Sequence, residues 1–199
     1  MAYYCVTIIY YWKHFTIKKM IASQNCINLI KMFEGYKEKA YLCPAGVPTI
    51  GYGSTMYSDG RKIKLGDTIN EQKANDLLMW ELINKSIALY NLDLNQNQFD
   101  SCLSFIYNLG IGSFTKSTLR KKVVANPNDP SIRLEFMKWN KATVDGKLIA
   151  LKGLTRRRIA EADWGSQSEA SARGCKPIRN TRCTSGDRYC PQGRSESRT

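Results

Sequence analysis

Apolar residues recur at helical spacing in five stretches of the chain, and glycines and prolines lie between these stretches. The stretches cover residues 27–34, 68–90, 95–110, 112–124 and 131–140. Gly35 stands where a left-handed cap would end the first helix, and Gly110 ends the third. Thr68 and Glu71 have the spacing of a capping box, which predicts that the second helix begins there.

The same pattern predicts which side chains of two of these helices face a core. On the second helix they are Ala74, Leu77, Leu78, Trp80, Glu81, Ile83 and Leu89, and on the last of the five they are Leu134, Phe136, Met137 and Trp139.

Two other stretches predict β-hairpins. Residues 39–52 alternate around the turn Cys43-Pro44-Ala45-Gly46, and residues 143–148 contain Asp145-Gly146, a dipeptide favoured in two-residue hairpin turns. A further short strand is expected at residues 62–65. The pattern as a whole therefore predicts an α+β fold that is mostly helical.

The two ends of the chain differ in composition from its middle. Residues 1–19 begin with an apolar run that is too short to cross a bilayer, and the run has neither the basic start nor the cleavage site of a secretory signal. Residues 165–199 are basic and rich in Ser and Arg, with too few apolar groups to form a core. We therefore expect a leader outside the fold at 1–19, one domain at 20–164 and a disordered tail at 165–199, with no stable membrane span.

The net charge of the 199-residue chain is +13, which implies an anionic partner such as nucleic acid, a membrane or the bacterial wall. The two ends contribute +3 and +4, and +6 remains in the middle. Because the excess is spread along the chain, it argues against a single stripe that binds nucleic acid. We expect a monomer that binds no nucleic acid.

The positions of the histidine and the cysteines exclude several kinds of chemistry. His14 is the only histidine and lies in the expected leader, and the seven cysteines include no C-x-x-C pair. We therefore expect no metal site, no cofactor and no Ser-His pair, which favours carboxylate chemistry. Cys26 and Cys102 lie on apolar helix faces, where free thiols of a protein made in a reducing cytoplasm are expected.

Glu34 is predicted to lie in the last turn of the first helix. The negative end of the helix dipole disfavours a charged carboxylate there, which suits a general acid. Glu34 alone is more typical of a solvated helix end, Cys43 alone of a small buried hydrophobe and Thr49 alone of an ordinary strand residue. Together they form the pattern Glu, eight residues, Cys, five residues, Thr, within Phe-Glu-Gly and Thr-Ile-Gly-Tyr-Gly.

This combined pattern resembles the phage-type lysozymes (endolysins) typified by T-even phage lysozyme, over about residues 20 to 164. The resemblance implies a small β-hairpin lobe, a connecting helix and a helical lobe. It also implies that Glu34, Cys43 and Thr49 are the catalytic residues. A cysteine in the middle position is a poor source of negative charge unless its thiol is ionised.

Three later motifs resemble parts of the family's substrate cleft. Tyr107 and Asn108 form an aromatic-amide step that would line the cleft, although an asparagine at a helix end is also a common cap. Ser117, or else Thr118, would contact substrate from a Phe-x-x-Ser-x-Leu step, with helix capping as the competing role.

The third motif is Gly153-Leu154-Thr155-Arg156-Arg157-Arg158-Ile159-Ala160-Glu161. By its resemblance to the family, Arg157 should approach Glu34, with Arg156 as the alternative. Without the resemblance, the run is typical of a basic, solvated helix face.

The resemblance implies a peptidoglycan hydrolase that cleaves the β-1,4 bond between N-acetylmuramic acid and N-acetylglucosamine with inversion, for bacteriolysis and phage release. It would stay in the host bacterial cytoplasm until the membrane is permeabilised, or leave through an N-terminal signal-arrest segment, and then act on the periplasmic wall. The alternative from another class is a non-catalytic cationic protein that binds the wall or a membrane.

Overall fold

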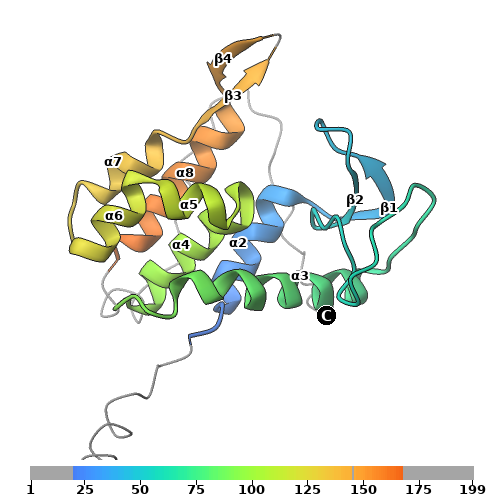
Figure 1. The fold of residues 1–199 in the computed structure, drawn as a ribbon, viewed down its shortest axis with the longest axis horizontal. Helices are drawn as coiled ribbons and strands as arrows, with labels where there is room; N and C mark the ends of the chain where they lie inside the picture. The colour runs from blue at the N-terminus through green and yellow to red at the C-terminus, as the bar shows by residue number, and fades with distance from the viewer. Residues whose placement is uncertain (1–19, 145, 168–199) are drawn as a thin grey trace, which may run out of the picture.

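The computed structural model describes residues 20–144 and 146–167, in which a helical body carries two small hairpins (Figure 1). In chain order the elements are α2 (Gln24–Glu34), β1 (Lys37–Leu42), β2 (Pro48–Gly51), α3 (Glu71–Ser86), the 3-10 helix η1 (Ile87–Leu89), α4 (Gln96–Leu109), α5 (Ile111–Lys116), α6 (Thr118–Ala125), α7 (Ile132–Met137), β3 (Lys141–Val144), β4 (Lys147–Ala150) and α8 (Lys152–Gly165). The prediction of a mostly helical α+β fold is confirmed.

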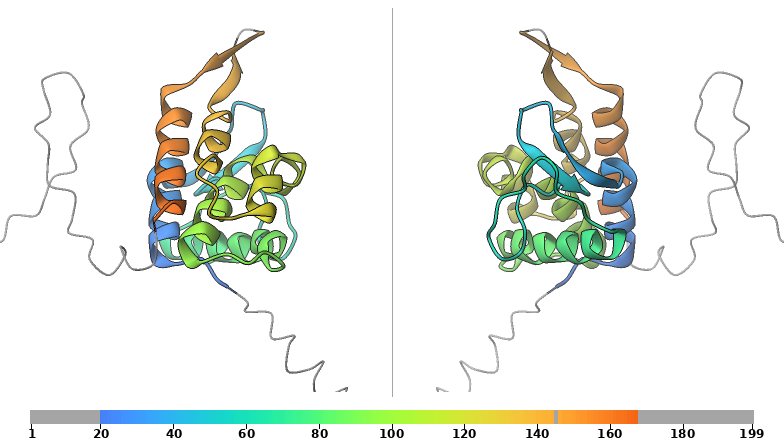
Figure 2. Two further views of the ribbon diagram at one scale, coloured as in Figure 1. Left: turned by 90° about the vertical axis from the view of Figure 1, so that its left-hand side faces the viewer. Right: turned by 90° about the vertical axis from the view of Figure 1, so that its right-hand side faces the viewer.

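The β1–β2 hairpin lies to one side of the helical body, and α3 runs from beneath it along the other helices (Figure 1). The second hairpin, β3–β4, stands out beyond the ends of α7 and α8, as both views in Figure 2 show. The predicted two-lobed arrangement with a connecting helix is therefore present.

Helix α2 places Glu34 at its end. The Ser23 hydroxyl accepts a hydrogen bond from the backbone N–H of Cys26 and so caps the first turn, and Ile27 and Ile30 are buried. Gly35 follows with φ 68° and ψ 153°. Its positive φ agrees with the prediction, but its ψ is extended, so the cap is not the left-handed helical one that we expected.

The β1–β2 pair is antiparallel, with Tyr41 opposite Thr49, which confirms the predicted hairpin. The strand expected at 62–65 is wrong. There Lys62 forms only an isolated bridge with Met56, made by the hydrogen bonds from the N–H of Ile63 to the carbonyl of Thr55 and from the N–H of Tyr57 to the carbonyl of Arg61.

Helix α3 begins later than predicted. Asn70 is its N-cap, and its side chain accepts a hydrogen bond from the N–H of Lys73. No helix begins directly after Thr68, because the N–H of the next residue, Ile69, donates to the carbonyl of Glu38 in the hairpin lobe. The predicted inward face is also partly wrong, since Ile83 is 46% exposed and Leu82 is buried in its place.

Helix α4 is the centre of the helical lobe. It has the capping box formed by Asn95 and Gln98, and it ends at Gly110 as predicted. Its Phe105 is fully buried and packs edge-on against the rings of Phe114, Phe136 and Trp139. Helix α4 also packs against α2 and α8, which are the helices that carry the candidate site.

The helix predicted at 112–124 is two helices, α5 and α6. Ser117 lies between them with extended backbone (φ −76°, ψ 153°) and its hydroxyl caps α6. Helix α7 is shorter than predicted, and Leu134 on it is 64% exposed rather than buried. The hairpin predicted at 143–148 is confirmed as β3–β4.

The described fold continues past the predicted boundary at 164. The carbonyl of Gln167 accepts a hydrogen bond from the Asn97 side-chain amide, and the Trp164 indole N–H donates to the same side chain. Residues 1–19 and 168–199, with the leader, His14 and four of the cysteines, lie outside the described residues. Between residues 20 and 167, the described part contains no helix with both the length and the apolar character for a bilayer span.

Candidate active site

Glu34 is the last residue of α2, and its side chain is 22% exposed. Its Oε1 accepts a 2.6 Å hydrogen bond from Nη1 of Arg157. Its Oε2 faces Gly53, where a Cβ would lie 3.4 Å from that oxygen, and it accepts no hydrogen bond within the described residues. One carboxylate oxygen is therefore held in place, and the other remains available.

Arg157 on α8 is the arginine that reaches Glu34, and its neighbour Arg156 is exposed. The side chain of Arg157 is 4% exposed. Besides Glu34, its guanidinium contacts Oε1 of Glu161 through Nε at 3.1 Å and the carbonyl of Ser104 through Nη2 at 3.4 Å. Helices α2, α4 and α8 thus meet at one guanidinium.

Cys43 and Thr49 lie close together at the turn of the β1–β2 hairpin. Thr49 is buried, and its hydroxyl donates a hydrogen bond to the carbonyl of Val47 at 2.9 Å. The backbone N–H groups of Val47 and Ala45, with a smaller contribution from the nearby Thr49 hydroxyl, stabilise the thiolate and hold the pKa of the Cys43 thiol below its usual value. The turn therefore favours the thiolate of Cys43.

Tyr41 connects this hairpin with Glu34 electrostatically. Partial loss of solvent raises the pKa of its hydroxyl, and the charges of Glu34 and Cys43 raise that pKa further. The Tyr41 phenol therefore lies within electrostatic range of both Glu34 and Cys43.

Tyr107 on α4 contacts the hairpin lobe beside Glu34. Its hydroxyl donates a 2.7 Å hydrogen bond to the carbonyl of Tyr52, and the ammonium group of Lys85 lies 5.1 Å from its ring centroid. Burial raises the pKa of the Tyr107 hydroxyl. Tyr107 therefore joins the two lobes at the site.

Asn108 and Ser117 also have roles within the protein. Oδ1 of Asn108 accepts a 3.0 Å hydrogen bond from Nη2 of Arg158, and its Nδ2 makes no hydrogen bond in the described part of the chain. The Ser117 hydroxyl donates to the carbonyl of Phe114 at 2.7 Å and accepts from the N–H of Arg120 at 3.0 Å. The competing capping role is the one that the structure displays for Ser117.

A sequence model described as phage lysozyme matches residues 31–161, most of the chain. The chain belongs to the phage lysozyme family. The endolysin of Acyrthosiphon pisum secondary endosymbiont phage 1 is 43% identical over 147 residues, which cover 71% of this chain and 95% of that protein. This lysozyme is therefore an enzyme of the endolysin class, a peptidoglycan hydrolase.

Solved structures agree with this assignment. The endolysin from Escherichia coli O157:H7 phage FAHEc1 superposes with a TM-score of 0.67 at 36% identity, covering 73% of this chain and 93% of that chain. A mutant of P22 lysozyme gives a TM-score of 0.62 at 34% identity, covering 74% and 99% of the two chains.

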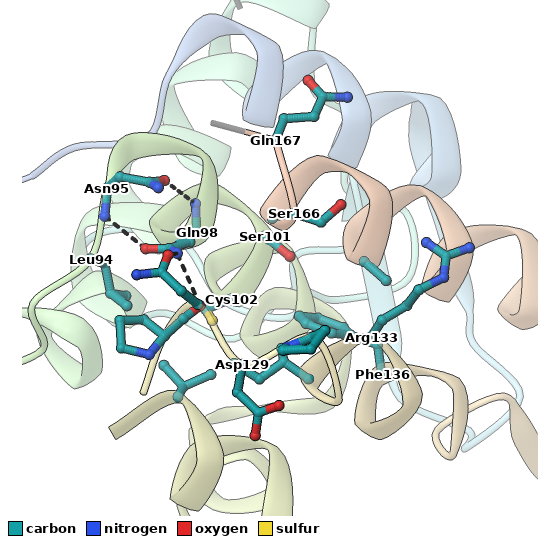
Figure 3. A pocket seen from close by; sticks show the side chains of 17 residues that line it. Leu94, Asn95, Gln98, Ser101, Cys102, Asp129, Arg133, Phe136, Ser166 and Gln167 are labelled. Atoms are coloured by element: carbon teal, nitrogen blue, oxygen red, sulfur yellow. Dashed lines mark hydrogen bonds between the residues drawn. The ribbon is translucent and has the colours of Figure 1, made fainter. Parts of the chain in front are cut away.

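A separate hollow of about 560 Å³ lies in the helical lobe of this lysozyme, where α4, α6, α7 and α8 meet (Figure 3). None of the predicted site residues lines it. Its central amide, Gln98, already accepts from the N–H of Asn95 and donates to the Pro127 carbonyl and the Asn128 side chain. Because these hydrogen bonds are all made within the protein, we read the hollow as a gap in helix packing.

Sequence reasoning missed the residues behind Arg157. Glu161 and Arg158 are fully buried, and Ser104 joins them from α4. The signal was present in the spacing, because Arg157 and Arg158 precede Glu161 by four and three residues and so share its helix face. Spacing alone could not show that this face is buried.

Proposed function

We propose that this lysozyme cleaves the β-1,4 bond between N-acetylmuramic acid and N-acetylglucosamine in peptidoglycan, with inversion at the anomeric carbon. Glu34 is the general acid that protonates the glycosidic oxygen. The observation that carries the proposal is the state of its carboxylate, with Oε1 fixed by Arg157 and Oε2 beside Gly53 without a hydrogen bond from any described residue. A general acid needs such an orientation, with one oxygen free to reach the leaving group.

Cys43 and Thr49 are the partners of Glu34 in this proposal. Inversion in one step requires a water molecule on the face of the sugar opposite the acid. The Thr49 hydroxyl has lone pairs that can accept a hydrogen bond from that water and so orient it, and its own hydrogen bond to the Val47 carbonyl fixes its position. Cys43, with its lowered thiol pKa, supplies negative charge near the sugar as it becomes positive.

Substrate contacts are proposed at two of the four predicted positions. Nδ2 of Asn108, which makes no hydrogen bond within the described residues, is a donor that suits the carbonyl of an N-acetyl group, and the ring of Tyr107 offers an apolar face to a sugar. Arg157 acts through Glu34. Ser117 is left out because both hydrogen bonds of its buried hydroxyl are made to the protein.

The setting that we propose is phage release. The enzyme stays in the cytoplasm of the host bacterium until the membrane is permeabilised, and then reaches the periplasmic wall. The net charge of +13 supports binding to that wall, which is anionic.

The decisive variant is Glu34→Gln, which keeps the shape of the side chain but removes its proton-donating group. Clearing of chloroform-treated Gram-negative cells should be lost, while sedimentation of the variant with purified peptidoglycan should persist. The matched control is Glu38→Gln on β1, an exposed glutamate in the neighbouring strand, which should clear cells like the wild type. Full clearing by Glu34→Gln would overturn the assignment of Glu34 as the general acid.

Two product analyses test the finer claims. Reduction of the digest with borohydride should convert muramic acid, and not glucosamine, to its alditol, because the cleaved bond leaves muramic acid at the new reducing end. Proton NMR during the first minutes should show the α-anomer, since inversion converts a β-linkage to an α-product. An initial β-anomer would rule out inversion.

A further inference from the structure

Glu161 is a buried carboxylate that the proposed reaction does not use. It is 0% exposed, and its Oε1 accepts hydrogen bonds from Oγ of Ser104 at 2.7 Å, Nε of Arg157 at 3.1 Å and Nη2 of Arg158 at 3.1 Å. Its Oε2 has no hydrogen-bond partner in the described part of the chain. A buried, half-satisfied carboxylate costs free energy, so packing alone does not account for it.

The geometry places Glu161 at the other end of the group that holds Glu34. Nε and Nη1 of Arg157 belong to one rigid, planar guanidinium. Nε bonds to Glu161 and Nη1 bonds to Glu34, while Nη2 reaches the carbonyl of Ser104. Once Glu161 fixes Nε, the direction of Nη1 toward Oε1 of Glu34 is also fixed.

We propose that Glu161 is a positioning residue, which holds Arg157 against Glu34 and balances part of the charge of its guanidinium. This inference rests on the proposed role of Glu34 as general acid. Glu161 itself touches neither substrate nor reacting atoms.

The charges in the cluster of Glu34, Arg157, Arg158 and Glu161 support the role proposed for Glu161. Two carboxylates, Glu34 and Glu161, face two guanidiniums, Arg157 and Arg158. Burial lowers the pKa of Arg158 to about 10, so it remains a cation at neutral pH. Burial raises the pKa of Glu161, and the two guanidiniums oppose that rise.

The thiols that pack against the cluster do not alter this balance. Cys26 on α2 and Cys102 on α4 both have raised thiol pKa values because they are buried, and the Glu161 charge adds to the effect. Both thiols are therefore neutral near pH 7. The charge of Glu161 is then what balances the second guanidinium.

The expected effect of removing that charge has a definite sign. In Glu161→Gln, two guanidiniums would face only Glu34, and both would stabilise its ionised form. The activity that depends on the acid form of the enzyme would then be lost at a lower pH than in the wild type. The alkaline limb of the pH–rate profile should therefore move to lower pH, by about one unit for a charge change at this range in a partly buried site.

The experiment compares Glu161→Gln with a matched control, Glu135→Gln. Glu135 on α7 is also a buried glutamate held by two cations, Lys122 at 3.0 Å and Lys138 at 2.8 Å, but it does not contact Glu34 or Arg157. Cell clearing and the hydrolysis of soluble peptidoglycan fragments would be followed from pH 4 to 10, in roughly half-unit steps, beside thermal unfolding of each variant.

Both variants should lose stability, but only Glu161→Gln should shift the alkaline limb and lower kcat there, about tenfold, with KM within about twofold of wild type. Profiles that superimpose on the wild type after correction for the folded fraction would overturn the inference and leave Glu161 a structural residue. This result is distinct from failure of the proposed function, which would appear as full activity of Glu34→Gln.

A second variant keeps the test decisive if Glu161→Gln does not fold. Glu161→Gln combined with Arg158→Gln restores equal numbers of buried carboxylates and guanidiniums. Arg157 would still lack its second partner, so the alkaline limb should move in the same direction by a smaller amount. An unshifted limb in this double variant would also overturn the inference.

Discussion

Nη1 of Arg157 lies 2.6 Å from Oε1 of Glu34, across 123 residues of sequence. This contact joins α8 to the end of α2, and it fixes the position of the Glu34 carboxylate. The guanidinium stabilises negative charge on Glu34, whereas the end of α2 disfavours it. The guanidinium and the helix end therefore act on one carboxylate in opposite directions. The contacts of Arg157 with Glu161 and Ser104 decide how much of the guanidinium charge acts on Glu34.

The contact predicts a graded response at position 157. Arg157→Met should lose about 3–5 kcal/mol of stability, because it leaves buried Glu161 with one cation fewer, and it should lose most activity. Arg157→Lys keeps the charge but cannot bridge two carboxylates, so its activity should be intermediate. The control Arg156→Met, at an exposed neighbour, should stay within about 0.5 kcal/mol of wild type. Denaturant unfolding and initial lysis rates measure these effects, and equal losses at both arginines would contradict the assignment.

Gly53 offers a second test, because its lack of a side chain leaves room beside Oε2 of Glu34. Gly53→Ala would place a Cβ 3.4 Å from Oε2 on a backbone with φ +100°, which suits glycine. We expect about 1–2 kcal/mol of strain and a fall in kcat of about tenfold or more, since small displacements at a reacting group are costly. Gly60→Ala is the control, with φ +87° and nothing within 4 Å of the added carbon. It should show the strain without the loss of kcat, and a normal kcat for Gly53→Ala would refute the role of this space.

The sequence predicted the local parts of this site well, because their signals are local. A helix end at Glu34, a glycine with positive φ at Gly35 and a hairpin with Tyr41 opposite Thr49 depend on neighbouring residues only. The free, buried states of Cys26 and Cys102 likewise followed from their places on apolar helix faces.

The errors arose where contacts distant in sequence override local preference. Thr68 has the chemistry of a cap, but the N–H of Ile69 after it donates to the carbonyl of Glu38, so the chain is not helical there and Asn70 caps α3. Ser117 divides the helix expected at 112–124 for a similar reason, because its extended backbone turns the chain between two packed helices. The burial of Glu161 could not be foreseen, because it depends on contacts with another helix, such as the hydrogen bond from Ser104 on α4.

The Ser117→Ala variant distinguishes helix capping from substrate contact as the role of the Ser117 hydroxyl. Ser117→Ala should destabilise the protein by about 1 kcal/mol through loss of the cap on α6, with kcat and KM unchanged in the folded enzyme. Asn70→Ala, which removes the corresponding cap of α3, is the matched control and should behave alike. Thermal unfolding and hydrolysis of soluble fragments would measure both. A severalfold rise in KM for Ser117→Ala alone would instead place its hydroxyl on the substrate.

Cys43 provides the last test, which depends on pH. Hydrogen bonds from Val47, Ala45 and Thr49 lower the thiol pKa, so the thiolate persists to lower pH than in a free cysteine. If the thiolate supplies the charge, the wild-type rate should fall as pH drops through that lowered pKa. Cys43→Asp should remain active to lower pH because a carboxylate ionises near pH 4, as its reference pKa of about 3.9 implies.

The controls for Cys43 separate charge from packing. Cys43→Ser keeps nearly the same size but does not ionise in this range, and Cys43→Ala removes the group altogether. Both should lose activity at every pH while unfolding at temperatures close to that of the wild type, because the side chain lies partly exposed at the end of the hairpin. Lysis rates between pH 4 and 9 would be compared for the four proteins, in roughly one-unit steps. Equal rates throughout would show that Cys43 only packs, and the chemistry would then rest on Glu34 and Thr49.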